Sequence, residues 1–275
     1  MGAMTLDGQT ASTLDVEGVT VRFGGVTALD GVSLQVPPNQ VAGIIGPNGA
    51  GKTTLFNVIC GFVHPASGGI SYGGRPLLGT PTHRLARLRI ARTLQGLGLW
   101  PGMTVLENVV EGSTVRTGFA TALLALPRAG RLERELAGSA HDILGELGIG
   151  GRANAYPGSL AYGVQKKVAI ARALMARPSL LLLDEPASGM STGEVEELAV
   201  LLSRLSERMS IAIVEHHLDL VMEVSHRVTV LNLGRVIASG APDEIRRDPA
   251  VASAYLGGEA AGAPLPAPAG EGGDA

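Results

Sequence analysis

The stretch GPNGAGKT, residues 46 to 53, has the residue types and spacing of a loop that binds phosphate groups. It follows the apolar run VAGII, typical of a buried strand, and precedes apolar residues at helical spacing. Glycines let backbone N–H groups surround phosphate oxygens, and the positive end of the next helix faces them. Lys52 is expected to reach the terminal phosphates and Thr53 to hold Mg²⁺. The motif therefore predicts a site for nucleotide phosphates with Mg²⁺.

A glycine-rich turn without a ligand is the alternative, since the chain contains 39 glycines. Against it, Lys52 is one of only three lysines in a chain that has nineteen arginines. Phe23 could stack on a base, although core packing is the usual fate of phenylalanine. We expect nucleotide contacts from Phe23, Gly46, Pro47, Asn48, Gly49, Ala50, Gly51, Lys52, Thr53 and Thr54.

Two adjacent acids, Asp184 and Glu185, follow the apolar run LLLL. They stand at the carboxyl end of a predicted buried strand, where α/β sheets bind ligands. Asp184 is expected to hold Mg²⁺, and Glu185 to polarise the water that attacks the γ-phosphate. A solvated strand end is the alternative, and the phosphate loop disfavours it.

Three further polar residues are candidates on weaker grounds. His216, in IAIVEHH, could contact the γ-phosphate, but an isolated histidine in a loop is also commonly just solvent-exposed. The pattern does not separate these two interpretations for His216 or for His217. Gln95 could contact Mg²⁺ or the attacking water, but a single glutamine carries no signal by itself.

Composition limits the remaining possibilities. The 275 residues carry a net charge of −3, which gives no general attraction to nucleic acid or acidic membranes. Cys60 is the only cysteine, so a disulfide within the chain is excluded and core filling is expected. The longest apolar candidate for a membrane span, FATALLAL, ends after eight residues at Pro127, so we expect membrane association only through a partner.

The order of elements predicts an α/β fold. Short strands precede the phosphate loop, a mostly helical middle follows, and strands then alternate with helices, which indicates a parallel sheet. We expect residues 1–14 to be disordered or cloning-derived, 15–257 to form one domain with a helical insert at about 95–175, and 258–275 to be a disordered Gly/Ala/Pro tail.

These pieces in this order resemble an ATP-binding cassette (ABC) ATPase. In that family Walker A corresponds to residues 46–53, the Q-loop to Gln95, the signature to LAYGV at 160–164, Walker B to LLLLDE and the switch histidine to His216, with a D-loop at 188–191. The likeness covers about residues 16–257. It implies a P-loop NTPase core, an N-terminal antiparallel β subdomain and an inserted α-helical subdomain.

The resemblance also implies a mechanism. ABC ATPases pair head to tail, so that each ATP lies between one subunit's Walker motifs and the other's signature. The signature residues that would contact the partner's ATP are Leu160, Ala161, Tyr162 and Gly163. The Q-loop segment, which contains the only tryptophan, Trp100, would grip a membrane subunit, although Trp100 could instead cap the core of the insert.

Within the family the chain is similar to the cytoplasmic ATPases of branched-chain amino-acid importers, through RFGG, LAYG, EPASGM, EHHLDLVM and AYLG. This implies a second ATPase subunit, two permease subunits, a solute-binding protein, and a location at the cytoplasmic face of the inner membrane. No nucleic-acid partner is expected. Lipopolysaccharide-export ATPases, soluble ABC ATPases that act on DNA or the ribosome, and small-molecule kinases are the alternatives.

The signature departs from the usual Leu-Ser-Gly-Gly-Gln. Ala161 replaces the serine whose hydroxyl meets the γ-phosphate, and Val164 replaces the glutamine. Lys166 and Lys167 are expected in the first turn of the next helix, where the dipole disfavours them unless an anion is present. They could face the partner's triphosphate, or be solvated surface lysines. We expect an asymmetric pair of ATP sites, in which the site completed by LAYGV is the weaker one.

Overall fold

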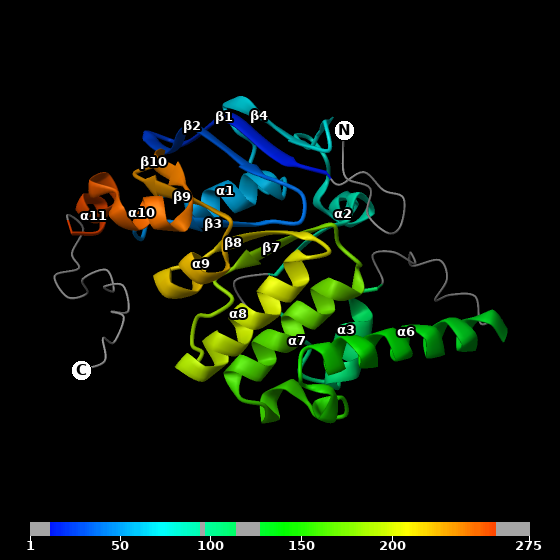
Figure 1. The fold of residues 1–275 in the computed structure, drawn as a ribbon. Helices are drawn as coiled ribbons and strands as arrows, with labels where there is room; N and C mark the ends of the chain where they lie inside the picture. The colour runs from blue at the N-terminus through cyan, green and yellow to red at the C-terminus, as the bar shows by residue number, and fades with distance from the viewer. Residues whose placement is uncertain (1–11, 94–96, 114–126, 257–275) are drawn as a thin grey trace, which may run out of the picture.

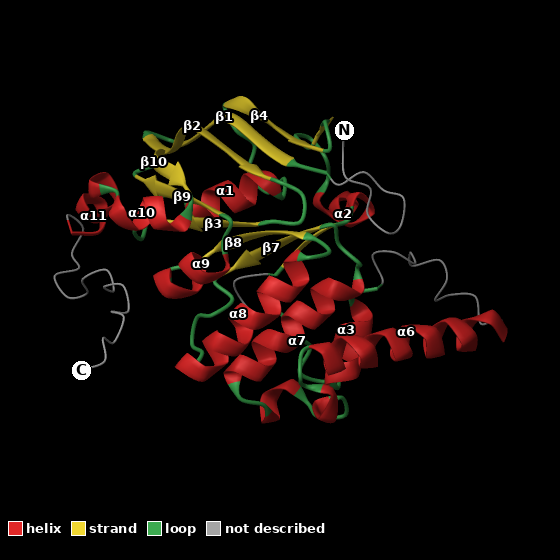
Figure 2. Cartoon of the chain, in the orientation of Figure 1, coloured by secondary structure: helices red, strands yellow, loops and turns green. Residues whose placement is uncertain are grey.

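The computed structural model describes residues 12–93, 97–113 and 127–256 (Figure 1). Gln95, residues 1–11 of the predicted N-terminal tail and the predicted tail at 258–275 lie outside these ranges. Two β-sheets enclose helix α1, and helices cover the far side of the larger sheet (Figure 2). The strands are β1 Leu14–Phe23, β2 Val26–Val36, β3 Val41–Ile45, β4 Ser67–Tyr72, β5 Arg75–Pro76, β6 Ile90–Arg92, β7 Leu180–Asp184, β8 Ser210–Val214, β9 Arg227–Asn232 and β10 Arg235–Gly240.

The smaller sheet has the order β2-β1-β4-β5, and its pairs are antiparallel. It packs over α1 and forms the antiparallel subdomain implied by the resemblance (Figure 1). β1 begins at Leu14, which is fully buried, so the described fold starts one residue before the boundary drawn from the sequence.

The larger sheet has the order β10-β9-β3-β8-β7-β6. Its strands from β9 to β6 are parallel, and β10 pairs antiparallel to β9 at one edge. Every residue of β3, β7 and β8 is buried, because α1 covers one face of the sheet and other helices cover the opposite face. Complete burial of a leucine stabilises the fold by about 1.5–3 kcal/mol, so the four leucines of β7 fix this strand firmly.

Helices lie on either side of this sheet and extend from it. The described helices are α1 Lys52–Ile59, α2 Thr82–Leu85, α3 Val105–Glu111, α6 Pro127–Glu146, α7 Tyr162–Met175, α8 Thr192–Ser206, α9 Leu218–Val224, α10 Pro242–Arg247 and α11 Pro249–Leu256, with 3₁₀ turns at Ala86–Leu88, Gly150–Arg152 and Pro157–Ser159. Helices α3, α6 and α7 pack on one another as an α-helical insert beside the sheet (Figure 1).

Helix α7 corrects one prediction about the lysines. It begins at Tyr162, so Lys166 and Lys167 lie in its second turn rather than its first. The field of the helix dipole fades after the first turn, and the electrostatic argument for an anion beside them is therefore weak. Both lysines are also buried, at 7% and 9% exposure, so the expectation of solvated surface lysines is wrong.

Candidate functional site

Three predicted motifs follow the carboxyl ends of strands in the larger sheet. β3 ends at Ile45 before the phosphate loop, β7 ends at Asp184, and β8 ends before Glu215 and His216. Because β3, β8 and β7 are adjacent and parallel, these carboxyl ends must lie side by side. The sheet topology thus brings Lys52, Asp184, Glu185 and His216 together, as the sequence predicts.

The phosphate loop needs glycine for steric reasons that its motif alone does not show. A Cβ at Gly46 would lie 2.1 Å from the carbonyl oxygen of Leu231, and one at Gly51 would lie 2.7 Å from that of Ala28. Gly51 also has a φ of 104°, a left-handed conformation that favours glycine. The loop borders a pocket of about 440 Å³ lined by Val26, Thr27, Ala28, Asn48, Gly49, Ala50, Gly51, Lys52, Thr53, Thr54, Glu185, Leu233 and Gly234.

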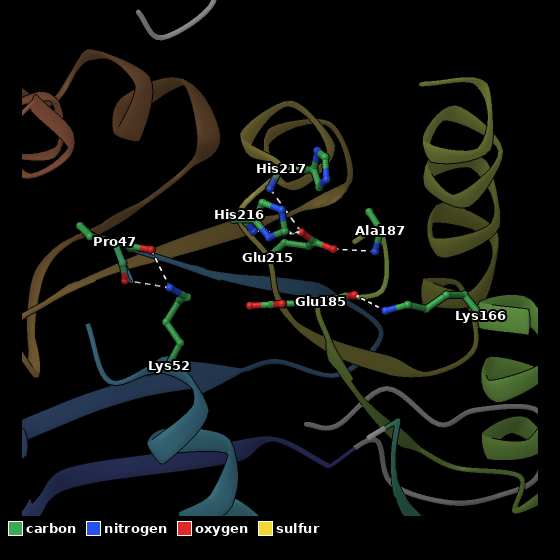
Figure 3. A network of polar contacts seen from close by, with 9 residues as sticks. Pro47, Lys52, Lys166, Glu185, Ala187, Glu215, His216 and His217 are labelled. Atoms are coloured by element: carbon green, nitrogen blue, oxygen red, sulfur yellow. Dashed lines mark hydrogen bonds and ion pairs between the residues drawn. The ribbon is translucent and has the colours of Figure 1, made fainter. Parts of the chain in front are cut away.

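Lys52 is the cation of this pocket. Its Nζ donates to the carbonyl oxygens of Gly46, at 2.6 Å, and Pro47, at 2.9 Å (Figure 3). Burial lowers the pKa of Lys52, and the nearby carboxylates of Glu185 and Asp184 oppose that shift. A triphosphate would supply stronger acceptors than these two carbonyl groups, since hydrogen bonds between charged partners are roughly twice as strong as neutral ones.

Asp184 is almost fully buried and forms an ion pair with Arg92 on β6, Nη2 to Oδ2, at 2.7 Å. Arg92 also donates to Asn57 at 2.9 Å, and its guanidinium lies over the Phe56 ring, 5.7 Å from the ring centre. Within the described residues, Oδ1 of Asp184 is buried without a hydrogen-bond partner. An unpartnered carboxylate oxygen beside a phosphate loop fits the oxygen-ligand chemistry of Mg²⁺.

Glu185 has an unusual backbone. Its φ is 48°, in the left-handed region that non-glycine residues enter at a cost of about 1–3 kcal/mol. Its N–H donates to Val214 at 2.8 Å, and its carbonyl oxygen accepts from the Nζ of Lys166 at 2.7 Å and from the N–H of Ser188 at 3.3 Å. This backbone directs the carboxylate toward the side on which Lys52 lies (Figure 3).

The switch segment after β8 is organised by Glu215. This carboxylate is fully buried and accepts the N–H groups of Ala187, at 2.6 Å, His216, at 2.9 Å, and His217, at 3.2 Å (Figure 3). The side chain of His216 is 49% exposed, and its ring lies against that of His217 with centroids 4.5 Å apart. Exposure leaves His216 accessible to a phosphate, and equally satisfies the interpretation as a solvated loop residue.

The two aromatic candidates are both exposed. Phe23 is 52% exposed at the end of β1, opposite Val26, so the core-packing alternative is wrong. Phe23 does not line the pocket, whereas Val26 does. Trp100 is 59% exposed and borders a second hollow of about 390 Å³, between α2, β6, the end of α3 and α7.

The signature segment lies at the start of α7. Ala161 is the N-cap residue, and Tyr162 is 45% exposed. Gly163 is buried and packs closely against Glu194 of α8. A Cβ at this position would lie 2.2 Å from Oε1 of that side chain. The segment thus presents the helix N-terminus with Ala161 where a serine hydroxyl is usual, and a carboxylate lies close behind it.

Sequence patterns did not reveal Arg92 or Glu215, and they did not reveal the contact between Lys166 and Glu185. Arg92 lies in a short strand far from Asp184 in the chain, and only the pairing of β6 with β7 brings them together. Lys166 and Glu215 act on backbone groups of residues 185–187, and such contacts have no sequence pattern. The scarcity of lysine was the one available signal for Lys166.

Comparisons with known proteins agree with this geometry. Residues 29–188 match the family model of the ABC transporter, and residues 235–261 match that of the branched-chain amino acid ATP-binding cassette transporter. The chain therefore belongs to the ABC transporter family and is an ABC-type ATPase, the class that the fold and the phosphate loop define.

Its relatives narrow the class. The high-affinity branched-chain amino acid transport ATP-binding protein BraF of Pseudomonas aeruginosa is 42% identical over 89% of this chain and 97% of its own length. The corresponding protein LivG of Escherichia coli is 40% identical over the same shares. The chain is thus an ATP-binding subunit similar to those of branched-chain amino acid transport.

Solved structures show the same fold. The ADP conformation of MJ1267, an ATP-binding cassette of an ABC transporter, has a TM-score of 0.78 at 31% identity, covering 90% of this chain and 100% of its own. The dimeric structure of MJ0796, a bacterial ABC transporter cassette, has a TM-score of 0.71 at 26% identity, covering 83% and 98%. The predicted fold class is confirmed.

Proposed function

We propose that the chain powers the uptake of branched-chain amino acids or related small polar solutes through partner membrane subunits. The observation that carries this proposal is the likeness to BraF and LivG over nearly the whole chain, together with the match at residues 235–261. No helix of the described residues is long and apolar enough to cross a membrane. The proposed place of the chain is the cytoplasmic face of the inner membrane, bound to those subunits.

The site residues divide the work of hydrolysis. Lys52 and the loop N–H groups would hold the β- and γ-phosphates, and Phe23 and Val26 would face the base. Thr53 and Asp184, with Gln95, would hold Mg²⁺, which screens the phosphate charge. Glu185 would orient and deprotonate the attacking water, and His216 would contact the γ-phosphate.

A second ATPase subunit completes each ATP site in this proposal. The pocket beside the phosphate loop is open, and this chain's own signature belongs to another part of its surface. The exposed N-terminus of α7, at Ala161 and Tyr162, would cover the triphosphate held by the partner. ATP would then bind the closed dimer more tightly than the open one. This difference in affinity between the two states can drive transport.

The hollow beside Trp100 is the proposed contact with a permease subunit. Phe62, at 56% exposure, and Trp100, at 59%, stand at an apolar surface that also includes Leu85 and Ala173. Arg172 fixes its edge by donating to the carbonyl oxygens of Leu97 and Gly98. An amphipathic helix of a membrane subunit, with its apolar side turned toward the hollow, suits this chemistry.

The test is reconstitution of the chain in liposomes with its membrane subunits and solute-binding protein. ATP hydrolysis should rise when a branched-chain amino acid is added with the binding protein. Trp100→Ala should reduce this stimulation. Val200→Ala is the matched control, since Val200 is also 59% exposed but lies on α8 outside the hollow.

Two outcomes would contradict the proposal. Failure of branched-chain amino acids, amides and urea to stimulate hydrolysis would exclude the proposed solute class. Equal stimulation in Trp100→Ala and the unchanged protein would exclude the contact with the permease.

A further inference from the structure

The backbone of residues 185–187, which follows the strand β7, is held by two buried charges of opposite sign. Lys166 bonds to the carbonyl oxygen of Glu185, and Glu215 bonds to the N–H of Ala187 (Figure 3). The two charges come from different elements. Lys166 belongs to the signature helix α7, and Glu215 to the switch segment after β8.

Lys166 is suited to restrain Glu185. Its Nζ lies 2.7 Å from a carbonyl group whose residue has a left-handed backbone. A conformation of this kind persists only where its surroundings hold it. The Lys166 ammonium also lies 5.5 Å from the ring centre of Tyr162, one turn earlier in α7. Tyr162 in turn covers Gly189, where a Cβ would lie 3.0 Å from its ring.

Glu215 restrains the other end of the segment and the switch residues together. All three of its bonds are to backbone N–H groups, those of Ala187, His216 and His217. Burial lowers the pKa of Lys166, while the charges of Glu215, Glu185 and Asp184 oppose that shift, with Glu215 contributing most. The buried cation and the buried anion thus compensate each other across the segment.

A metal site is the competing interpretation of this region. Glu215, His216 and His217 could bring three ligand atoms within 4.8 Å of one another. However, both oxygens of Glu215 already accept backbone N–H groups, and a metal ion would have to displace these bonds. The contacts of Glu215 favour a structural restraint over ligation.

We propose that Lys166 and Glu215 are positioning residues that clamp residues 185–187 and so hold the Glu185 carboxylate in its hydrolytic position. The clamp rests on the proposed role of Glu185 in hydrolysis. It also joins the signature helix, which serves the partner's ATP, to the Walker B glutamate of this chain. A movement of α7 on contact with the partner's nucleotide would then reach Glu185 through Lys166.

Steady-state ATP hydrolysis by the full-length chain tests this clamp. Lys166→Met keeps the alkyl stem and removes the donor, and should lower kcat by about tenfold to hundredfold, because small misplacements of a catalytic group have effects of this size. The KM for ATP and the calorimetric affinity should stay within about twofold. Lys166→Arg, which restores a charged donor, should recover most of kcat.

Glu215→Gln should lower kcat in the same way, because an amide nitrogen would face the N–H groups that the carboxylate now accepts. The double variant should lose less than the product of the two single losses, since both act on one segment. If Lys166→Met does not fold, Lys166→Leu replaces it with the same expectation, because leucine also lacks a hydrogen-bond donor.

Lys167→Met is the matched control, because Lys167 pairs with Glu197 of α8 and does not contact residues 185–187. It should keep kcat. An unchanged kcat in Lys166→Met, or a failure of Lys166→Arg to restore activity, would overturn the clamp. Glu185→Gln separates the two proposals, because normal hydrolysis in that variant would refute the role of Glu185 itself, whatever Lys166→Met shows.

Discussion

The phosphate loop and the signature segment both end at a helix N-terminus, but the chain equips the two differently. At the phosphate loop, Lys52 and Glu185 line one pocket, and the buried carboxylate of Asp184 lies close enough to oppose the lowering of the pKa of Lys52 by burial. At the signature segment, the N-cap is Ala161, and no side chain caps α7. The two nearest lysines turn into the protein instead of toward the helix terminus.

This difference indicates where the chain concentrates its chemistry. The charged groups that we propose to bind and hydrolyse ATP gather at the carboxyl ends of the strands, which buried residues hold in place. The signature segment offers mainly backbone N–H groups, and the Glu194 carboxylate lies behind it. We therefore propose that the ATP site built on this chain's Walker motifs is the stronger one, and that the site completed by its signature is weaker.

Glu185→Gln should have the largest effect, because it removes the proposed general base from the ATP site built on this chain's Walker motifs. Hydrolysis should fall by about 10²–10⁴-fold, because a general base typically contributes that much. ATP affinity should remain, since the loop and Lys52 are intact. Single-turnover hydrolysis of radiolabelled ATP measures this, and turnover at the rate of the unchanged protein would sink the assignment.

Arg92→Met should destabilise the same ATP site, because Arg92 holds Asp184 in place. It leaves the buried carboxylate of Asp184 without its partner, and losing one partner of a buried pair costs about 3–5 kcal/mol of the free energy of unfolding. Addition of Mg²⁺ with ATP should recover part of that loss if Asp184 is a metal ligand. Chemical denaturation with and without Mg²⁺ and ATP measures both effects.

Arg235→Ala is the control for Arg92→Met. Its ion pair with Asp30 is exposed, with side-chain exposures of 72% and 38%, so it should cost less than about 1 kcal/mol. An equal loss of unfolding free energy in the two variants would show that the burial of the Arg92 pair has no special role.

Restoring the usual serine and glutamine of the signature should have the smallest effect of these changes. Ala161→Ser with Val164→Gln adds two side-chain hydrogen-bonding groups at the partner's ATP. One such bond is worth about 0.5–1.5 kcal/mol, or about twofold to tenfold in rate. ATP hydrolysis by the assembled complex should rise by this factor. No change would count against the proposed weakness of that site.

Much of this arrangement is predictable from the sequence, because it depends on local patterns. The glycine spacing around Lys52, the apolar run before Asp184 and the order of strands and helices give the fold class and the motifs at the edge of the sheet. The family resemblance then supplies the assignments of Phe23, Gln95 and Ala161. All three assignments stay predictions, and Gln95 lies outside the described residues.

The remaining features depend on contacts between distant segments. Burial of Lys166 and Lys167 was predicted wrongly because lysines near a helix start are ordinarily exposed, and only the packing of α7 against residues 185–187 and α8 covers them. The pair of Arg92 and Asp184 spans 92 positions of the chain. No local pattern reports such a contact.

The central claim is that the phosphate loop and the signature segment of one chain serve different nucleotides. Calorimetric titration of the isolated chain with ATP and Mg²⁺ tests this claim most directly. Lys52→Ala should weaken binding by about tenfold to hundredfold, because it removes a charged donor worth about 1.5–3 kcal/mol. Ala161→Asp should fold normally, since aspartate is a favoured N-cap residue, and should keep the affinity of the unchanged chain. If Ala161→Asp weakens binding as much as Lys52→Ala does, the signature and the phosphate loop of one chain serve the same nucleotide, and the account is wrong.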